Sequence, residues 1–321
     1  MFESDDHIFP AKPELVKENK KSTITKFALS ALLFIGLFLS LFSDNYIFIL
    51  EIIGILLIHE IGHLIFMKKY GYKSLSMIFI PFLGAMVGGD TKETTQKQKF
   101  IISLMGPLPG ILIGSGLFIA FIFNPENEGL LELSLLFISI NLLNLIPVDP
   151  LDGGHIVEAL LFPQNDTIKM YFTVISSFII IGTGFYFDFV ILTLFGFFMA
   201  FKVRGFQKSQ RIYEGLDDID FDYERDYNDL TNKDYWTIRR VFLENNPKIQ
   251  DMIPSEMTLW ENERLIVDQI KQLLKMKVRL DLTPVKSILL FLIYLMVIAF
   301  PIFLLSINWH LIQPYLAPNG L

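Results

Sequence analysis

Seven apolar runs, each near the length a helix needs to cross a bilayer, constrain this chain more than any other feature. A transmembrane helix takes about 20 mostly apolar residues, within a range of roughly 17–25. The runs lie at 27–43, 46–67, 100–123, 130–147, 169–184, 188–203 and 285–307. The fifth and sixth runs are short and almost adjacent, so they form either two spans or one broken hairpin. We therefore predict an all-α multi-pass membrane protein with six to seven transmembrane helices.

The composition agrees with a membrane protein and excludes several other classes. Of the 321 residues, 52% are hydrophobic and 19% are charged, whereas soluble domains carry about 25% charged residues. Intrinsic disorder needs low hydrophobicity and is excluded. The chain has no Cys, so any metal must be held by His, Asp or Glu. The net charge of −7, without a basic stripe, gives no reason to expect a nucleic-acid partner.

The charged residues separate polar segments from the apolar runs and indicate which side of the membrane each segment faces. Short cytoplasmic loops are enriched in Lys and Arg. Lys68 and Lys69 follow the second run, whereas the loops at 43–45 and 124–129 carry neither residue type. The sequence thus predicts four segments: a cytoplasmic N-terminal tail (1–26), a transmembrane core (27–203), a helical cytoplasmic insert (204–284), and a C-terminal transmembrane helix with its tail (285–321).

Two segments depart from the pattern of spans. Residues 72–90 are too short for a span and are interrupted by Pro and Gly, so we expect a short membrane-embedded β-hairpin or a re-entrant segment. In the insert, the acidic stretch 214–229 is expected to be a solvated linker. Helical patterns follow at about 231–245 and from Ser255 onward. The second helix has a basic end, so either it lies on the membrane surface or the two helices pack on each other.

The second apolar run ends in the sequence His59-Glu60-Ile61-Gly62-His63. Residues four apart share one face of a helix, so both imidazoles can reach a single metal ion. Glu60 lies beside that face, where it can act as a general base toward water. The alternative is a pair of histidines satisfied by interhelical hydrogen bonds. It is disfavoured inside a span, because ionisable groups there are costly and mark functional sites.

A third metal ligand is expected between Asn144 and His155, where the fourth run ends. Catalytic zinc usually has three protein ligands. Two prolines stop the helix and two glycines allow a tight backbone, so this segment can form a loop that turns a carboxylate inward. Asp152 is the first candidate, ahead of Asp149 and then His155. Asn141, one turn before Asn144, is expected to make an interhelical hydrogen bond.

The two motifs together resemble the site-2 protease family of intramembrane zinc metalloproteases. The similarity covers roughly residues 46–160. It also includes Gly106-Pro107-Leu108-Pro109-Gly110 and the run Asn144-Leu-Ile-Pro-Val-Asp-Pro-Leu-Asp-Gly-Gly154. The resemblance makes Asp152 the third zinc ligand beside His59 and His63, and it places Asn144 at the substrate carbonyl or developing oxyanion. His155 departs from the pattern, because relatives often carry Arg there, and the insert at 205–284 resembles no domain of the family.

The resemblance implies a zinc metalloendopeptidase, with Zn²⁺ as its cofactor and Glu60 and Asn144 as catalytic residues. Its substrates would be transmembrane proteins or peptides in the lipid bilayer, cleaved near the cytoplasmic face of the membrane (the cell membrane, if the chain is bacterial). A regulatory partner is expected at the insert. One alternative is a metal-binding regulator that holds membrane proteins without cleaving them. Another is a metal transporter, which would need ligands strung across the bilayer rather than gathered near one face.

Overall fold

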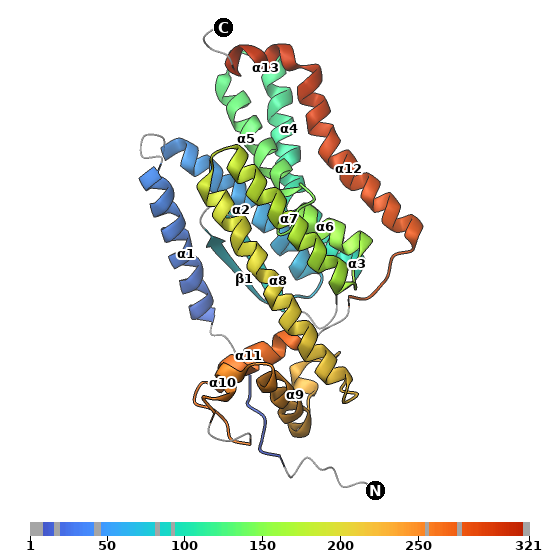
Figure 1. The fold of residues 1–321 in the computed structure, drawn as a ribbon. Helices are drawn as coiled ribbons and strands as arrows, with labels where there is room; N and C mark the ends of the chain where they lie inside the picture. Colours follow the sequence, from blue (N-terminus) through green and yellow to red (C-terminus); the bar gives the residue numbers. More distant parts are fainter. Residues whose placement is uncertain are drawn as a thin grey trace. The chain divides into compact units, whose positions relative to one another are not determined.

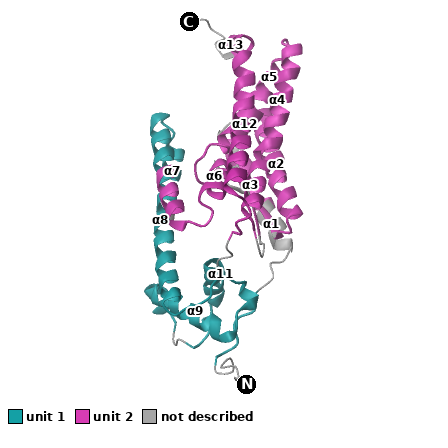
Figure 2. Cartoon of the chain, turned by 90° about the vertical axis from the view of Figure 1, so that its right-hand side faces the viewer, with its two compact units in different colours: residues 1–17, 177–277 teal, residues 18–176, 278–321 magenta. Residues whose placement is uncertain are grey.

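The structure, a computed structural model, describes most of the chain as two compact units (Figures 1 and 2). One, which we call the core unit, comprises residues 18–176 and 278–321, and the other, the insert unit, comprises residues 1–17 and 177–277. The predicted division into four segments rests on polarity alone and stays a prediction. The described residues are 9–15, 20–41, 46–80, 84–90, 94–253, 257–274 and 278–316.

The core unit consists mainly of helices, as the sequence predicts. α7 (Asp166–Tyr186) begins in this unit and ends in the insert unit. The other helices are α1 (Lys20–Leu41), α2 (Tyr46–Lys69), α3 (Gln96–Met105), α4 (Pro107–Phe123), α5 (Glu128–Asn144), α6 (Asp152–Leu161), α12 (Pro284–Ile307) and α13 (Trp309–Leu316) (Figure 1).

A β-hairpin interrupts the helices between α2 and α3. Its strands, β1 (Lys73–Ile80) and β2 (Gly84–Asp90), pair antiparallel, with Met77 opposite Val87. Of the two alternatives that the Pro and Gly residues left open, the structure therefore has the hairpin. Its depth in a membrane stays a prediction.

Five helices of the described chain are long and apolar enough to cross a membrane. They are α2, α3 continued by α4, α7, α8 (Val190–Asp217) and α12. α1 and α5 coincide with two further predicted runs, but α5 has 17 residues and the apolar stretch of α1 is only 28–37. α12 buries only Tyr294 and Pro301. Its remaining apolar surface is suited to contact with lipid, since transmembrane helices are apolar where they meet the hydrocarbon core.

The predicted run at 100–123 is divided into two helices. Thr95 caps α3: its side-chain oxygen accepts from the Gln98 backbone N–H (3.1 Å), and the Gln98 side chain accepts from the Thr95 backbone N–H (3.2 Å). Such a capping box satisfies two donors that a helix start leaves unpaired, so the helix begins before residue 100. Gly106 ends α3, and Pro107, which lacks an N–H, occupies the first position of α4.

α12 packs against the segment that joins α5 to α6. The Tyr294 side chain is 1% exposed, and its hydroxyl donates to the carbonyl of Leu145, 2.5 Å away. Leu145 is the first residue after α5, so this contact supports the loop that leads to α6. The surrounding apolar cluster joins α3, α4, α6 and α12 through Phe100, Leu104, Ile111, Leu145, Ile156, Leu160 and Tyr294.

The insert unit contains α8 and a small helical module. The module consists of the short turn η2 (Tyr227–Asp229) and the helices α9 (Asn232–Glu244), α10 (Pro247–Gln250) and α11 (Glu263–Leu273). The apolar faces of α9 and α11 share one buried cluster, so these helices pack on each other, as one of the two alternatives predicted. The expectation of a solvated linker at 214–229 is wrong at Leu216 and Tyr227, because both are buried in the same cluster.

Candidate metal centre

α2 brings the two motif histidines to one buried face. His59 is 3% exposed and His63 is 9% exposed, and their Nε2 atoms lie 3.1 Å apart. This proximity follows from their spacing of four residues, which is close to one helical turn. Glu60 follows His59 and is 4% exposed. The helix alone therefore supplies two nitrogen atoms that can bind a metal and an adjacent buried carboxyl group.

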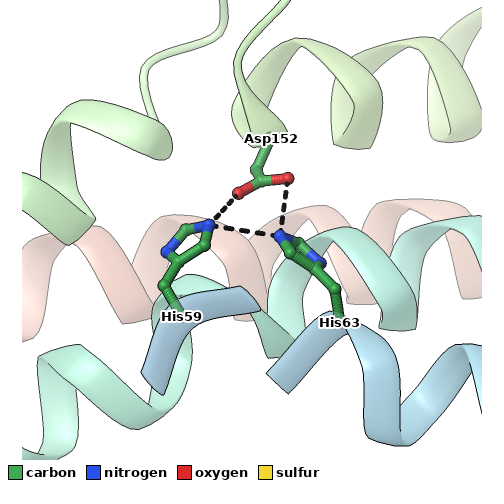
Figure 3. Close-up of side chains that lie close together, drawn as sticks. All are labelled: His59, His63 and Asp152. Carbon is green, nitrogen blue, oxygen red and sulfur yellow. Dashed lines mark hydrogen bonds and ion pairs between the residues drawn. The ribbon is translucent and has the colours of Figure 1, made fainter. Parts of the chain in front are cut away.

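Asp152 completes the group from a distant part of the chain. α5 ends at Asn144, a loop containing Pro147 and Pro150 follows, and Asp152 is the first residue of α6. Figure 3 shows its carboxyl group pointing toward the two imidazoles on α2. One carboxylate oxygen lies 3.0 Å from Nε2 of His59, and the other lies 3.3 Å from Nε2 of His63. The structure therefore brings together the three residues predicted as metal ligands.

The other ring nitrogen of each histidine faces a hydrogen-bond acceptor. Nδ1 of His59 lies 2.9 Å from Oδ1 of Asn141, and Nδ1 of His63 lies 2.8 Å from the carbonyl of Ile102. The Asn141 amide is oriented by its own bond, because its nitrogen donates to the Phe137 carbonyl at 2.8 Å. In a neutral imidazole only one nitrogen carries a proton, so Nδ1 is the donor in both rings. Both Nε2 atoms then present lone pairs.

The centre of the group thus contains acceptors and no donor. Two Nε2 lone pairs and a carboxylate converge within hydrogen-bond distance, which is unfavourable unless a cation lies among them. That cation is either a proton on an imidazole or a metal ion. Three corners of a tetrahedral zinc site with ligands at about 2.0–2.1 Å lie about 3.3–3.4 Å apart. The observed separations of 3.0–3.3 Å are close to this spacing, so the three residues fit zinc.

The Gly106-Pro107-Leu108-Pro109-Gly110 segment makes room for both histidine assemblies. A Cβ atom on Gly106 would lie 2.2 Å from Nε2 of His63. A Cβ atom on Gly110 would lie 2.0 Å from the amide nitrogen of Asn141. Both distances are far below van der Waals contact. The two glycines are therefore required where α3 and α4 pass the metal group.

The remaining predicted site residues are not among the three convergent side chains. Asn144 donates its amide to the Ile140 carbonyl of its own helix at 3.0 Å. Asp149 accepts a hydrogen bond from the Thr173 hydroxyl at 2.9 Å, which ties the loop to α7. His155 is exposed, and within the described residues it is not part of the group that converges on one point.

Sequence reasoning identified Asn141 only as an interhelical hydrogen bonder. That prediction is confirmed, since the bond joins α5 to α2. The partner was missed: it is His59, so Asn141 fixes which nitrogen faces the metal group. Such outer partners orient the ligands of protein metal sites. The available signal was the amide of Asn141 in the apolar run, one helical turn before the Asn144 motif.

Comparisons with known proteins agree with the motifs. Residues 47–134 match the family model described as peptidase family M50. Zinc metalloprotease MJ0392 of Methanocaldococcus jannaschii is 36% identical over 128 residues, which are 38% of this chain and 36% of that protein. Stage IV sporulation protein FB of Bacillus subtilis is 27% identical over 111 residues, which are 34% of this chain and 38% of that protein. The chain thus spans little more than a third of the length of these two relatives.

A solved structure is also similar. The site-2 protease from Methanocaldococcus jannaschii has a TM-score of 0.41 and 25% sequence identity, and the match covers 56% of this chain and 87% of that chain. The family-model match and the zinc metalloprotease relative confirm the resemblance drawn from the two motifs. The name of the relative, zinc metalloprotease, agrees with the predicted cofactor, and His59, His63 and Asp152 could together hold a metal ion.

Proposed function

We propose that the chain is an intramembrane zinc metalloendopeptidase, and the proposal starts from the match of residues 47–134 to the model of peptidase family M50. In this proposal it cleaves peptide bonds in or near the transmembrane segments of other membrane proteins. The observation that supports it most is the convergence of His59, His63 and Asp152 on one point, with acceptors facing inward and no donor among them. A group with that arrangement requires a cation.

The proposed zinc ligands are His59, His63 and Asp152. When bound, zinc supplies Lewis acidity, which polarises a scissile carbonyl and makes a water molecule more acidic. The partners of the outer nitrogens, Asn141 and the Ile102 carbonyl, hold both rings so that Nε2 faces the ion. The ligands are thereby oriented before the ion arrives, which reduces the reorganisation that binding requires.

Glu60 is the proposed general base. It is buried beside the histidine pair, where it can accept a proton from the attacking water and return it to the leaving amine. Asn144 is the proposed oxyanion donor. Its amide nitrogen now bonds to the Ile140 carbonyl, so a rotation of the side chain must release that bond before the amide can donate to substrate.

The position of the group along α2 supports a site near the cytoplasmic face. His63 lies five residues before Lys68, about 7.5 Å along a helix axis, and both Lys68 and Lys69 lie in the last turn of α2. Basic residues at the end of a span favour the cytoplasmic side. Water can then reach the group over a short path, and a substrate helix can approach it from within the bilayer.

The test of this function is Glu60→Gln in the full chain, reconstituted with single-span model peptides. Loss of the general base should lower the cleavage rate by about 10²- to 10⁴-fold, while the zinc content stays unchanged. Glu51→Gln is the matched control, because Glu51 lies on the same helix two turns before His59. Cleavage by the Glu60→Gln chain at the original rate would refute the mechanism. A zinc-loaded original chain that cleaves none of the peptides would favour the non-proteolytic regulator.

A further inference from the structure

Residues 9–15 belong to the insert unit and lie against its other segments, although more than 200 residues of chain separate them from their partners. We call these residues the N-terminal strap. Phe9 and Leu15, at its two ends, pack against the buried cluster that α9 and α11 form. The strap has no helix or strand of its own. Its position therefore depends on the contacts it makes with the insert unit.

Two backbone carbonyls of the strap accept hydrogen bonds from aromatic side chains. The indole N–H of Trp236 donates to the Pro10 carbonyl at 2.7 Å, and the hydroxyl of Tyr227 donates to the Pro13 carbonyl at 2.9 Å. Proline fixes its own φ and favours extended backbone in the preceding residue. A polyproline II segment repeats every three residues, so the Pro10–Pro13 spacing places both carbonyls on one face. Aromatic-lined grooves in peptide-binding domains likewise bind Pro-rich segments in this extended conformation.

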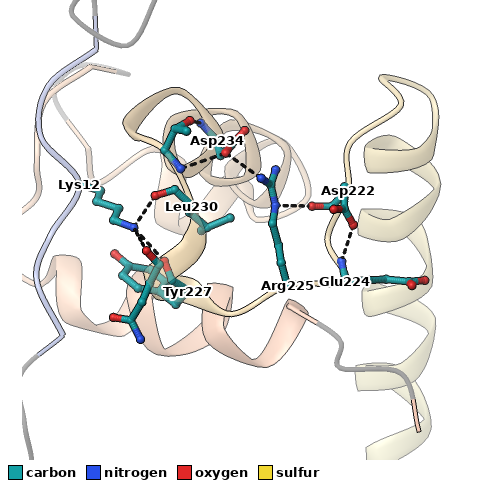
Figure 4. Close-up of polar contacts among 9 residues, drawn as sticks. Lys12, Asp222, Glu224, Arg225, Tyr227, Leu230 and Asp234 are labelled. Atoms are coloured by element: carbon teal, nitrogen blue, oxygen red, sulfur yellow. Dashed lines mark hydrogen bonds and ion pairs between the residues drawn. The ribbon is translucent and has the colours of Figure 1, made fainter. Parts of the chain in front are cut away.

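Between the two prolines, Lys12 fills a socket of carbonyl groups. Its ammonium donates to the carbonyls of Tyr227 (2.9 Å), Asn228 (3.1 Å) and Leu230. The first two carbonyls belong to the η2 turn and the third follows it. Figure 4 shows the Lys12 side chain directed toward Tyr227 and Leu230. The ammonium also lies 5.3 Å from the centre of the Tyr227 ring. Three acceptors match the three donors of an ammonium.

The backbone of the same residue is also recognised. The Lys12 N–H donates to the side-chain oxygen of Asn232, at the start of α9, at 2.9 Å. The η2 turn and α9 thus form hydrogen bonds with two carbonyls, one amide and one ammonium within four residues of the strap. Contacts to main chain give affinity in peptide recognition, and pockets for individual side chains give specificity.

We propose that the insert unit carries a binding site for an extended Pro-x-Lys-Pro peptide, with the strap of the same chain as its resident ligand. Only four residues separate Leu15 from Lys20, where α1 begins. Occupancy of the site therefore ties the start of the first predicted span to the insert unit. This inference does not depend on the proposed protease activity.

The experiment compares the full chain with a chain that lacks residues 1–15, both in detergent. The probe is a fluorescein-labelled peptide of residues 9–15, and binding is followed by fluorescence anisotropy. The truncated chain should bind the peptide saturably. The full chain should bind it at least about tenfold more weakly, because the tethered strap competes at a high effective concentration. The Lys12→Ala peptide should bind the truncated chain about 10- to 100-fold more weakly, since charge-assisted bonds are lost.

Two variants of the truncated chain test the groove. Trp236→Phe removes the indole N–H and should weaken peptide binding by about 2- to 10-fold. Trp260→Phe is the matched control, since Trp260 packs against the same cluster but is absent from the strap's hydrogen bonds in the described chain. Circular dichroism verifies that each variant is folded. A folded truncated chain that ignores the peptide, or binds the Lys12→Ala peptide equally well, overturns the proposal. So does a full chain that exchanges its strap with a second copy to form a dimer.

Discussion

The two units each bury a cluster of polar side chains, and the clusters differ in whether the protein itself supplies a donor for every acceptor. In this sense we call the cluster of the insert unit complete and that of the core unit incomplete. In the insert unit, Glu263 accepts two bonds from Arg239 (2.6 and 3.0 Å), one from the Tyr235 hydroxyl and one from the Trp260 backbone N–H (2.9 Å). In the core unit, His59, His63 and Asp152 turn only acceptors toward one another. A cluster whose donors and acceptors match serves stability, and one whose side chains present only acceptors to one another indicates a binding site for a cation.

Burial alone does not separate the two clusters. The side chains of Arg239 and Glu263 are 1% and 8% exposed, and Arg239 lies 4.8 Å from the Trp236 ring. The side chains of His59, His63 and Asp152 are 4%, 11% and 12% exposed. The clusters therefore differ in how their donors match their acceptors rather than in how deeply they are buried.

The largest expected effect comes from a substitution in the incomplete cluster, the metal group. Asp152→Asn removes the negatively charged zinc ligand. Loss of a residue that only hydrogen-bonds to a ligand lowers metal affinity by roughly 10- to 100-fold, so the affinity of this variant for zinc should fall by more than that. Competition with a chromophoric chelator measures this affinity in the detergent-solubilised chain. Asp149→Asn is the control, because Asp149 belongs to the same loop but bonds to Thr173. Equal zinc affinities for the two variants would remove Asp152 from the ligand set.

The next effect comes from a substitution in the complete cluster around Glu263. Arg239→Ala leaves the Glu263 carboxylate buried without its cation, which should lower the free energy of unfolding of the insert unit by about 3–5 kcal/mol. Arg240→Ala, on the exposed face of the same helix, should cost far less. Chemical denaturation followed by Trp fluorescence measures both. The double replacement Arg239→Met with Glu263→Leu should recover most of the loss, since matched polar groups can be exchanged for apolar ones. Apolar replacement of His59, His63 and Asp152, in contrast, is not expected to restore zinc binding.

A smaller effect concerns the outer partner of His59. In Gly110→Ala, the new methyl group would clash with the Asn141 amide and displace it from Nδ1 of His59. The zinc affinity should fall by about 10- to 100-fold. Gly116→Ala on the same helix is the control, because its Cβ would meet nothing within 4 Å. If both variants keep the original affinity, Asn141 does not orient the ligand.

The smallest effect is a pH dependence of the complete cluster. Burial alone would raise the pKa of Glu263, but the hydrogen bonds from Arg239 and Tyr235 outweigh it and hold the pKa below its ordinary value. A folded-state pKa below the unfolded one stabilises the fold above the unfolded pKa, near 4.5, and this stabilisation is lost as the pH falls through the folded pKa. The insert unit should therefore unfold more readily as the pH drops below about 4.5.

Denaturation of the insert unit at several pH values measures this change. Glu263→Gln should flatten the pH dependence while lowering stability at neutral pH. The exposed Glu261→Gln should leave the profile unchanged. A Glu263→Gln chain with the original profile would assign the pH dependence to other groups.

The metal group could be predicted from sequence because its information is local. His59 and His63 share a helical turn, and prolines and glycines mark the loop that carries Asp152. The hairpin at 73–90 was predictable for the same reason. The pairing of Asn141 with His59 was not, because it depends on how α5 packs on α2, and Gly110 acquires its meaning only from that packing.

The strap lay further beyond sequence reasoning. Residues 1–26 form a polar, Lys-rich segment, which predicts a tail. Two of the carbonyl partners of Lys12, those of Tyr227 and Asn228, lie in the acidic stretch that was expected to be a linker. There Tyr227 is buried despite its charged neighbours, because the short η2 turn directs it into the cluster of α9 and α11. Such long-range contacts have no periodic pattern in either segment.

X-ray absorption at the zinc edge, on the purified full chain, tests most directly whether one ion completes the acceptor group. We expect one zinc per chain, coordinated by two imidazole nitrogens and by oxygen at about 2.0–2.2 Å. The two imidazoles should disappear from the spectrum when His59 and His63 are both replaced by Ala. A chain without zinc after gentle purification, or a spectrum without imidazole, would contradict the assignment.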